Sequence, residues 1–222
     1  MCFWRKNGKE KYVNALKMLN KKSITELRKN VKILVVDDAD ENLYEVLKER
    51  QYNVYYKGDM TYAIEAEPFD IILLDIRGIA SRLKSNMEGF ALACEIKKAY
   101  PLKKVCCYSG SIYQEISGML AEKRIDAFFQ KDLEIDKIAE KIDGLIEEYV
   151  DYEKQWDVLY YELRKNKIDD DDILEIHKAY LESFKTGNVS RFNNITIEKI
   201  KNGTVLLNMI SAFLSIVKAV VV

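Results

Sequence analysis

The sequence predicts an α/β fold in which helices flank both faces of a doubly wound, five-stranded parallel sheet. Over residues 31–149, short apolar runs alternate with helix-like stretches, and runs such as ILVV and IILL are apolar at every position. Strands of a parallel sheet have this composition because both of their faces are buried. Residues 1–30 and 150–222 lack the alternation, so we expect a basic helical N-terminal arm and a helical C-terminal module.

The expected strands and helices follow one another strictly. The strands are expected at Val31–Asp37, Asn53–Tyr56, Phe69–Asp75, Lys104–Tyr108 and Asp126–Gln130. The helices are expected at Glu41–Arg50, Tyr62–Glu67, Gly89–Tyr100, Tyr113–Arg124 and Asp136–Tyr149. Parallel strands require crossover connections of this kind, so the alternation itself indicates a parallel sheet.

Charge is distributed unevenly along a chain whose net charge is only -1. Residues 1–30 hold nine lysines and arginines against two acids, whereas residues 31–149 hold sixteen against twenty-three. The arm is expected to be helical from Lys9 to Lys21. It either packs on the C-terminal helices or contacts an anionic membrane or nucleic acid. The C-terminal module lacks a basic recognition helix, so DNA binding is not expected there.

The four cysteines favour a reducing compartment. Cys106 and Cys107 are adjacent in an expected strand, so their side chains point to opposite faces and are not expected to form a disulfide. No cysteine spacing is typical of a zinc site, and the stretch MCFWRKNGKEK lacks an apolar signal core. We therefore expect a cytoplasmic protein.

An apolar stripe continues beyond the last expected helix of the sheet region. Its members step by four and three residues: Ile138, Ile142, Leu145, Tyr149, Tyr152, Trp156, Leu159 and Leu163. This pattern predicts one extended helix. Past Tyr149 the helix either packs on later helices of this chain or forms a homodimer seam.

Two more helices are expected in the C-terminal module. The acidic run Asp169–Asp172 favours a helix N-terminus, and Gly187 favours its end, so a helix is expected at Asp170–Lys185. His177 on that helix is interpreted as a packing or surface residue. Residues 204–222 are apolar and long enough for a membrane span, but polar residues form one stripe along them. A buried bundle helix is favoured over membrane contact.

Polar side chains end four of the expected strands. Asp37 and Asp38 end the first, Asp75 the third and Ser109 the fourth, and Lys131 follows the fifth. The carboxyl ends of parallel strands meet at one edge, so these side chains are expected to converge. Three carboxylates repel one another, and Mg²⁺ relieves that repulsion because it prefers oxygen ligands. A carboxylate beside Mg²⁺ and a lysine can accept a phosphoryl group. The alternative is that these residues merely end buried strands in solvent.

The order VVDD, LLD, YSG and QK over residues 31–149 resembles the receiver domain of bacterial two-component response regulators. The resemblance implies a (βα)5 fold with flavodoxin-like strand order. It also implies that Asp75 is the phosphoacceptor. Asp37 and Asp38 would bind Mg²⁺ together with Asp75 and the backbone carbonyl of Arg77.

The resemblance implies three further roles. Ser109 would be the switch hydroxyl, Phe128 the switch aromatic residue and Lys131 the lysine that contacts the phosphoryl group. The donor would be a sensor histidine kinase or another phosphodonor. The change would pass through the face formed by the fourth helix, fifth strand and fifth helix to the C-terminal helices. Apart from self-phosphorylation and slow self-dephosphorylation, no enzymatic activity is implied.

The chain departs from the family after Asp75. Gly89 lies fourteen residues further on, a longer loop than the family has, and Asp132 replaces the proline that usually follows the lysine. These departures support a first alternative, a pseudo-receiver that binds partners without phosphorylation. A second alternative is a phosphatase similar to haloacid dehalogenases, because Asp38-x-Asp40 resembles their nucleophile motif.

Overall fold

A computed structural model describes residues 22–79, 88–110, 124–200 and 203–221. Within them, five parallel strands form one sheet in the order β2-β1-β3-β4-β5. The strands are β1 (Lys32–Val36), β2 (Asn53–Lys57), β3 (Ile71–Asp75), β4 (Lys104–Ser109) and β5 (Ala127–Gln130). The prediction of five strands in a doubly wound sheet is confirmed, and the strand order is the flavodoxin-like one.

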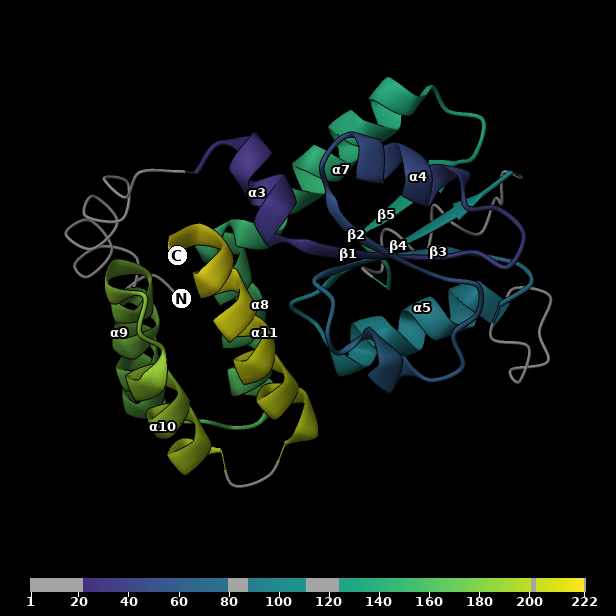
Figure 1. Cartoon of the computed structure of the whole chain (residues 1–222). Helices are drawn as coiled ribbons and strands as arrows, with labels where there is room; N and C mark the ends of the chain where they lie inside the picture. The colour runs from purple at the N-terminus through teal and green to yellow at the C-terminus, as the bar shows by residue number, and fades with distance from the viewer. Residues whose placement is uncertain (1–21, 80–87, 111–123, 201–202, 222) are drawn as a thin grey trace.

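Helices cover both faces of the sheet (Figure 1). On one face α4 (Asn42–Glu49) and α7 (Ile135–Val150) pack through Leu47 and Ile138. On the other face lie α5 (Glu88–Ala99) and a four-residue 3-10 helix, η1 (Ala63–Ala66).

The element η1 corrects the helix expected at Tyr62–Glu67, which is reduced to a single 3-10 turn. The expected helix comprised only six residues, too few for a stable α-helix. The helix expected at Tyr113–Arg124 lies almost entirely outside the described residues, as does the one expected from Lys9 to Lys21.

Adjacent residues on each strand face opposite sides, which separates the two neighbouring cysteines. Cys106 packs in the apolar cluster on the α4 and α7 side, and Cys107 in the cluster on the α5 side. Both are buried and free of disulfides, as the alternation predicted.

A short helix that the sequence analysis missed, α3 (Ile24–Asn30), precedes β1. Ser23 and Glu26 form a reciprocal capping box at its start, and Leu27 is buried. Arg28 joins it to α7 through two hydrogen bonds to the Asp143 carboxylate. This end of the expected arm is therefore packed against α7.

The prediction of one extended helix through Tyr149 is wrong, because the helix is interrupted at Asp151. α7 ends at Val150, Asp151 adopts an extended conformation, and α8 (Tyr152–Lys165) begins. The Asp151 carboxylate accepts hydrogen bonds from the backbone N–H groups of Glu153 (2.9 Å) and Lys154 (3.1 Å). This cap satisfies amides that a continuous helix would bond to carbonyls one turn earlier.

Past the break, the apolar stripe packs inside the same chain. Trp156, Leu159 and Leu163 of α8 are buried in one apolar cluster with residues of the later helices. These helices are α9 (Asp170–Thr186), α10 (Ser190–Lys199) and α11 (Thr204–Val221). We name α8 to α11 the helical bundle. Because the stripe is already covered, it is not available as the dimer seam that we had considered.

The last two helices complete the bundle. α9 ends at Gly187 (φ 71°), as predicted, whereas α10 was not predicted. Within the described residues, α11 is the one helix long and apolar enough to span a membrane, and 44% of it is buried. Its apolar side lies against the other helices, and Asn208 from its polar stripe donates to the Ala99 carbonyl (2.9 Å). This packing is what we expected of a bundle helix.

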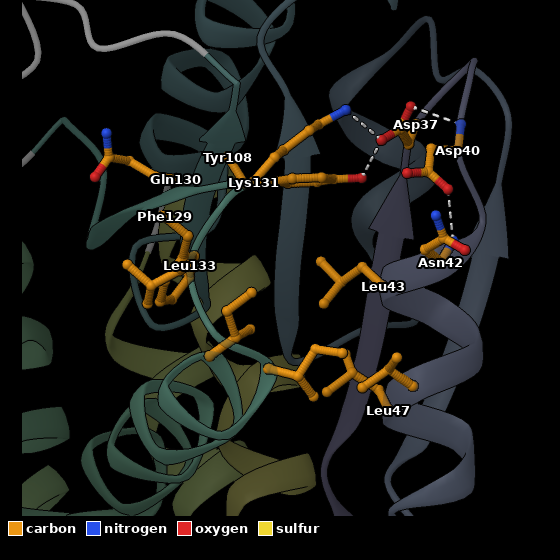
Figure 2. A pocket seen from close by; sticks show the side chains of 13 residues that line it. Asp37, Asp40, Asn42, Leu43, Leu47, Tyr108, Phe129, Gln130, Lys131 and Leu133 are labelled. Carbon is orange, nitrogen blue, oxygen red and sulfur yellow. Dashed lines mark hydrogen bonds and ion pairs between the residues drawn. The ribbon is translucent and has the colours of Figure 1, made fainter.

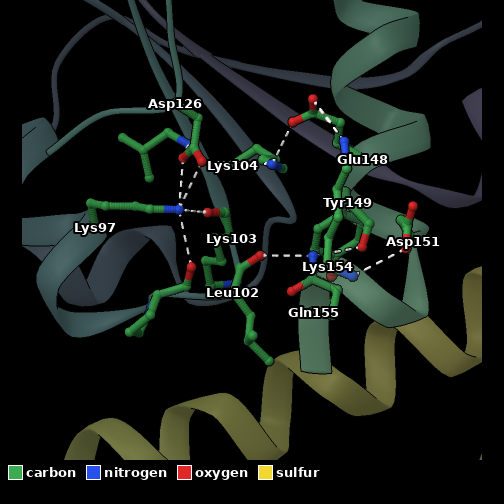
Figure 3. A network of polar contacts seen from close by, with 12 residues as sticks. Lys97, Leu102, Lys103, Lys104, Asp126, Glu148, Tyr149, Asp151, Lys154 and Gln155 are labelled. Carbon is green, nitrogen blue, oxygen red and sulfur yellow. Dashed lines mark hydrogen bonds and ion pairs between the residues drawn. The ribbon is translucent and has the colours of Figure 1, made fainter. Parts of the chain in front are cut away.

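The bundle meets the sheet at the amino ends of the strands (Figures 1 and 3). Asp70, just before β3, accepts from the Tyr149 hydroxyl (2.6 Å) and from the Lys32 backbone N–H (2.8 Å). Gln155 of α8 donates to the Tyr149 carbonyl (2.7 Å) and, more weakly, to the Leu102 carbonyl (3.4 Å). The carboxyl ends of the strands, where ligands bind in such sheets, lie at the opposite edge.

Candidate phosphoryl-acceptor site

Three carboxylates converge at the carboxyl edge of the sheet. Asp37 and Asp38 follow β1, and Asp75 is the last residue of β3, the neighbouring strand. One oxygen from each carboxylate lies within 4.8 Å of the others. Asp37 and Asp75 are buried, whereas Asp38 is exposed. The structure thus brings together the three acids that the strand ends predicted.

Lys131 joins two of these acids. Its Nζ donates to Oδ2 of Asp37 (2.6 Å) and to Oδ2 of Asp75 (2.7 Å). Its backbone N–H donates to the Ser109 carbonyl (2.9 Å), which fixes the lysine beside the end of β4. Burial lowers the pKa of the lysine, but its hydrogen bonds to the two carboxylates outweigh burial and raise the pKa above its ordinary value.

Within the described residues, the Asp37 carboxylate accepts four hydrogen bonds, shown in part in Figure 2. Oδ1 accepts from the backbone N–H groups of Ala39 (3.0 Å) and Asp40 (3.1 Å). Oδ2 accepts from Lys131 and from the Tyr108 hydroxyl (2.7 Å). Burial raises the pKa of this carboxyl, but the lysine, the Ala39 N–H and the tyrosine hold it below its usual value.

Tyr108 is a site residue that the sequence analysis missed. It is paired with Asp75 in the register of β3 and β4, and it is 4% exposed. In the sequence it reads as an apolar residue at the end of a strand. Its position could have indicated a role, because Tyr108 directly precedes Ser109, the last residue of β4, and a phenol there can reach the acids at the ends of the neighbouring strands.

Two glycines let the backbone approach the acids closely. A Cβ at Gly78 would lie 2.3 Å from the carboxylate oxygens of Asp38, and the residue has a φ of +79°. A Cβ at Gly89 would lie 1.8 Å from the Asp75 carbonyl oxygen. The backbone therefore lies against Asp38 at Gly78 and against Asp75 at Gly89, and glycine is needed at both positions because a side chain would clash there.

The remaining expected site residues occupy the same edge or its surroundings. Ser109 is buried at the end of β4, in register with Gln130. Phe128 on β5 is partly buried and packs with the α5-side cluster. Arg77 is exposed, two residues past Asp75. Their roles as switch residues and as a metal ligand stay predictions.

The donor set suits a hard divalent cation. Three carboxylates with one lysine give an excess of negative charge, and Mg²⁺ is bound in proteins by a few carboxylates together with water. The exposed Asp38 leaves one side of the group open to solvent. Asp37, Asp38 and Asp75 would hold the ion.

Asp40, the second acid of the phosphatase-like motif, points elsewhere. Its Oδ1 accepts the backbone N–H of Asn42 (2.8 Å) at the start of α4. It is not part of the three-carboxylate group found among the described residues. Asp40 therefore does not lie beside Asp38 as the second acid that the phosphatase-like motif requires.

A pocket of about 410 Å³ opens beside the acids, between α4 and α7 (Figure 2). Its polar end contains Asp37, Tyr108 and Lys131. Its apolar walls are Leu43, Val46, Leu47, Phe129, Leu133, Ile135 and Ile138.

No family model and no curated protein matches this chain. Similar solved structures do exist. A CheY-like response regulator receiver domain protein from Methanospirillum hungatei JF-1 is 23% identical, with a TM-score of 0.44 over 54% of this chain and 95% of that one. CheY4 from Vibrio cholerae is 17% identical, with a TM-score of 0.42 over 52% and 98%. The receiver domain of NtrX from Brucella abortus is 24% identical, with a TM-score of 0.41 over 52% and 98%. Two of these three solved structures are named as receiver domains, and the similarity to each covers about half of this chain.

Proposed function

We propose that the chain is a response-regulator-like signalling protein that accepts a phosphoryl group on Asp75. The observation that carries this proposal is the Lys131 ammonium between the carboxylates of Asp37 and Asp75 at the carboxyl edge of the sheet. A lysine in this place can neutralise a phosphoryl oxygen once Asp75 carries the phosphoryl group as an acyl phosphate. Asp37 and Asp38, together with the Arg77 carbonyl, would complete a Mg²⁺ site.

The proposed reaction is a displacement at phosphorus. An oxygen of Asp75 forms a new P–O bond, and the bond between phosphorus and the donor's leaving group breaks, so that the leaving group departs with the electron pair. Mg²⁺ supplies positive charge that offsets the charge on the phosphoryl oxygens. Lys131 turns from Oδ2 of Asp75 to one of those oxygens, and Ser109 donates its hydroxyl to another.

Mass spectrometry after incubation with acetyl phosphate and Mg²⁺ tests the proposal. The wild type should gain the mass of one phosphoryl group, and Asp75→Asn should gain none. Asp59→Asn is the matched control, because Asp59 also follows a strand, β2, but is exposed and not part of the acidic group. It should be modified as the wild type is.

Other outcomes separate the alternatives. An unmodified wild type that also fails to bind beryllofluoride would contradict the proposal and favour a pseudo-receiver that binds partners without phosphorylation. Steady hydrolysis of a phosphate ester that is lost in Asp38→Asn would favour the phosphatase instead.

We further propose how the change reaches the bundle. Phosphorylation would shift Ser109 and Phe128, and the change would travel through the expected fourth helix, β5 and α7. Because α7 leads directly into α8 at Asp151, it is the covalent connection between the sheet and the bundle. The donor would be a sensor histidine kinase or another phosphodonor in the cytoplasm.

A further inference from the structure

We propose that Tyr108 is a positioning residue that sets the affinity of the acidic site for a divalent cation. The inference rests on the proposed function, because it concerns the same site. Tyr108 would hold the Asp37 carboxylate in a fully hydrogen-bonded state that a metal ion must partly undo.

The hydrogen bonds of Asp37 carry the argument. An ionised carboxylate has about four lone-pair positions, and Asp37 has four donors, two on each oxygen. A cation that coordinates Asp37 must therefore displace a donor or share an oxygen with one. Each donor also withdraws negative charge that would otherwise attract the cation.

The four donors differ in how easily they leave. The backbone amides of Ala39 and Asp40 are fixed by the turn after β1. Lys131 has a second acceptor in Asp75, and its side chain is 27% exposed, so it can move. Tyr108 is 4% exposed, and its ring packs in the same apolar cluster as Phe129. The phenol is therefore the donor that stays on Asp37.

Tyr108 also contacts Lys131, the donor to Asp37 that can move. The Lys131 Nζ lies 4.9 Å from the centre of the Tyr108 ring, within the range of a cation–π contact. One buried side chain thus holds both the acid and its lysine. Removing only the hydroxyl should free one lone pair on Asp37 and leave the ring contact in place.

Isothermal titration calorimetry with Mg²⁺ tests the inference on the full chain. Tyr108→Phe should bind Mg²⁺ about tenfold more tightly than the wild type, the change expected from losing one hydrogen bond to a charged acceptor. Tyr56→Phe is the matched control, because the Tyr56 hydroxyl donates to the main-chain carbonyl of Asp37 (2.5 Å) and not to its carboxylate. Its affinity should stay within about twofold of the wild type.

A purely structural role predicts a different pattern. If Tyr108 only supported the fold, Tyr108→Phe would lower both thermal stability and Mg²⁺ affinity, whereas the proposal requires tighter binding in a less stable protein. Circular dichroism with and without Mg²⁺ checks that Tyr108→Phe, which keeps the buried ring, is folded.

Unchanged or weaker binding by Tyr108→Phe, with normal binding by the wild type, would overturn this inference and leave the proposed function standing. Absence of Mg²⁺ binding in the wild type and in every variant would overturn both.

Discussion

At the scale of single residues, burial lowers the pKa of Lys103 at the amino end of the sheet. Its ammonium donates to the carbonyls of Glu67 (2.7 Å) and Phe69, and the residue is 4% exposed. Burial lowers the pKa of Lys103 to about 8, against a favourable interaction with Asp70. The folded protein therefore releases this proton more easily than the unfolded chain does.

This difference predicts how stability depends on pH. Between pH 8 and the ordinary lysine value of 10.5, the unfolded chain binds more protons at Lys103, so the free energy of unfolding should rise with pH. The rise from this group should be at most about 3 kcal/mol. Urea denaturation at pH 8 and pH 9.5 measures it, and Lys103→Met should show a smaller rise than the wild type. An equal rise in both proteins would exclude Lys103 as the cause.

Gly78 offers a second prediction at this scale. Gly78→Ala should destabilise the protein by about 1–3 kcal/mol, because its φ of +79° strains any side chain and the Cβ would meet the Asp38 carboxylate at 2.3 Å. The displaced acid should also weaken Mg²⁺ binding. The control is Gly58→Ala, where a Cβ meets nothing within 4 Å. Calorimetric titration and urea denaturation of both variants check the difference.

The residues of the site could be predicted to different degrees. Asp37, Asp38, Asp75 and Lys131 were predicted to converge because strand ends in a parallel sheet share one edge. Tyr108 was not, because strand alternation gives only the face of the sheet on which a side chain lies. Whether the phenol then packs or donates a hydrogen bond depends on the side-chain rotamer.

At the scale of secondary-structure elements, two glycines in helices are predicted to behave in opposite ways. Gly89→Ala should severely destabilise the protein and abolish phosphorylation, because the Cβ would lie 1.8 Å from the Asp75 carbonyl, a backbone atom that cannot move away. Gly144→Ala in α7 meets nothing within 4 Å and should stabilise the protein by about 1 kcal/mol or less. Thermal unfolding of the two variants provides the comparison. A Gly89→Ala protein as stable as the wild type would contradict this packing of α5.

The break between α7 and α8 explains the main error of the element prediction. Tyr149 and Trp156 keep the four-three spacing across Asp151 because both helices bury their stripe in one cluster. A buried stripe therefore does not require a continuous helix. The missed helix α3 had a readable signal, the Ser23 and Glu26 capping box, but it is too short for apolar periodicity to be recognised.

At the scale of the whole molecule, the sheet and the bundle share one apolar core. A single cluster contains Val35 of β1, Ile142 of α7, Tyr180 of α9 and Phe213 of α11. Tyr180 alone contacts the rings of Trp156, Phe184, Phe192 and Phe213. The described residues of the three segments that we predicted as domains, residues 1–30, 31–149 and 150–222, are therefore proposed to unfold together.

Denaturation followed by two probes tests this cooperativity. The chain has two tryptophans, so Trp4→Phe leaves Trp156, in the bundle, as the fluorescent probe. Its unfolding transition should coincide with that of the whole chain, followed by far-ultraviolet circular dichroism. Two separated transitions would show that the bundle and the sheet are independent domains.

Because the bundle packs at the amino ends of the strands, it leaves the carboxyl edge of the sheet accessible to a binding partner. Gln155 and Asn208 reach the sheet region through Leu102 and Ala99, while Asp75 opens at the opposite edge. A donor protein that docks over Asp75 and a target that docks on the bundle would thus approach from different sides. Binding of the proposed donor would then not exclude binding of the target.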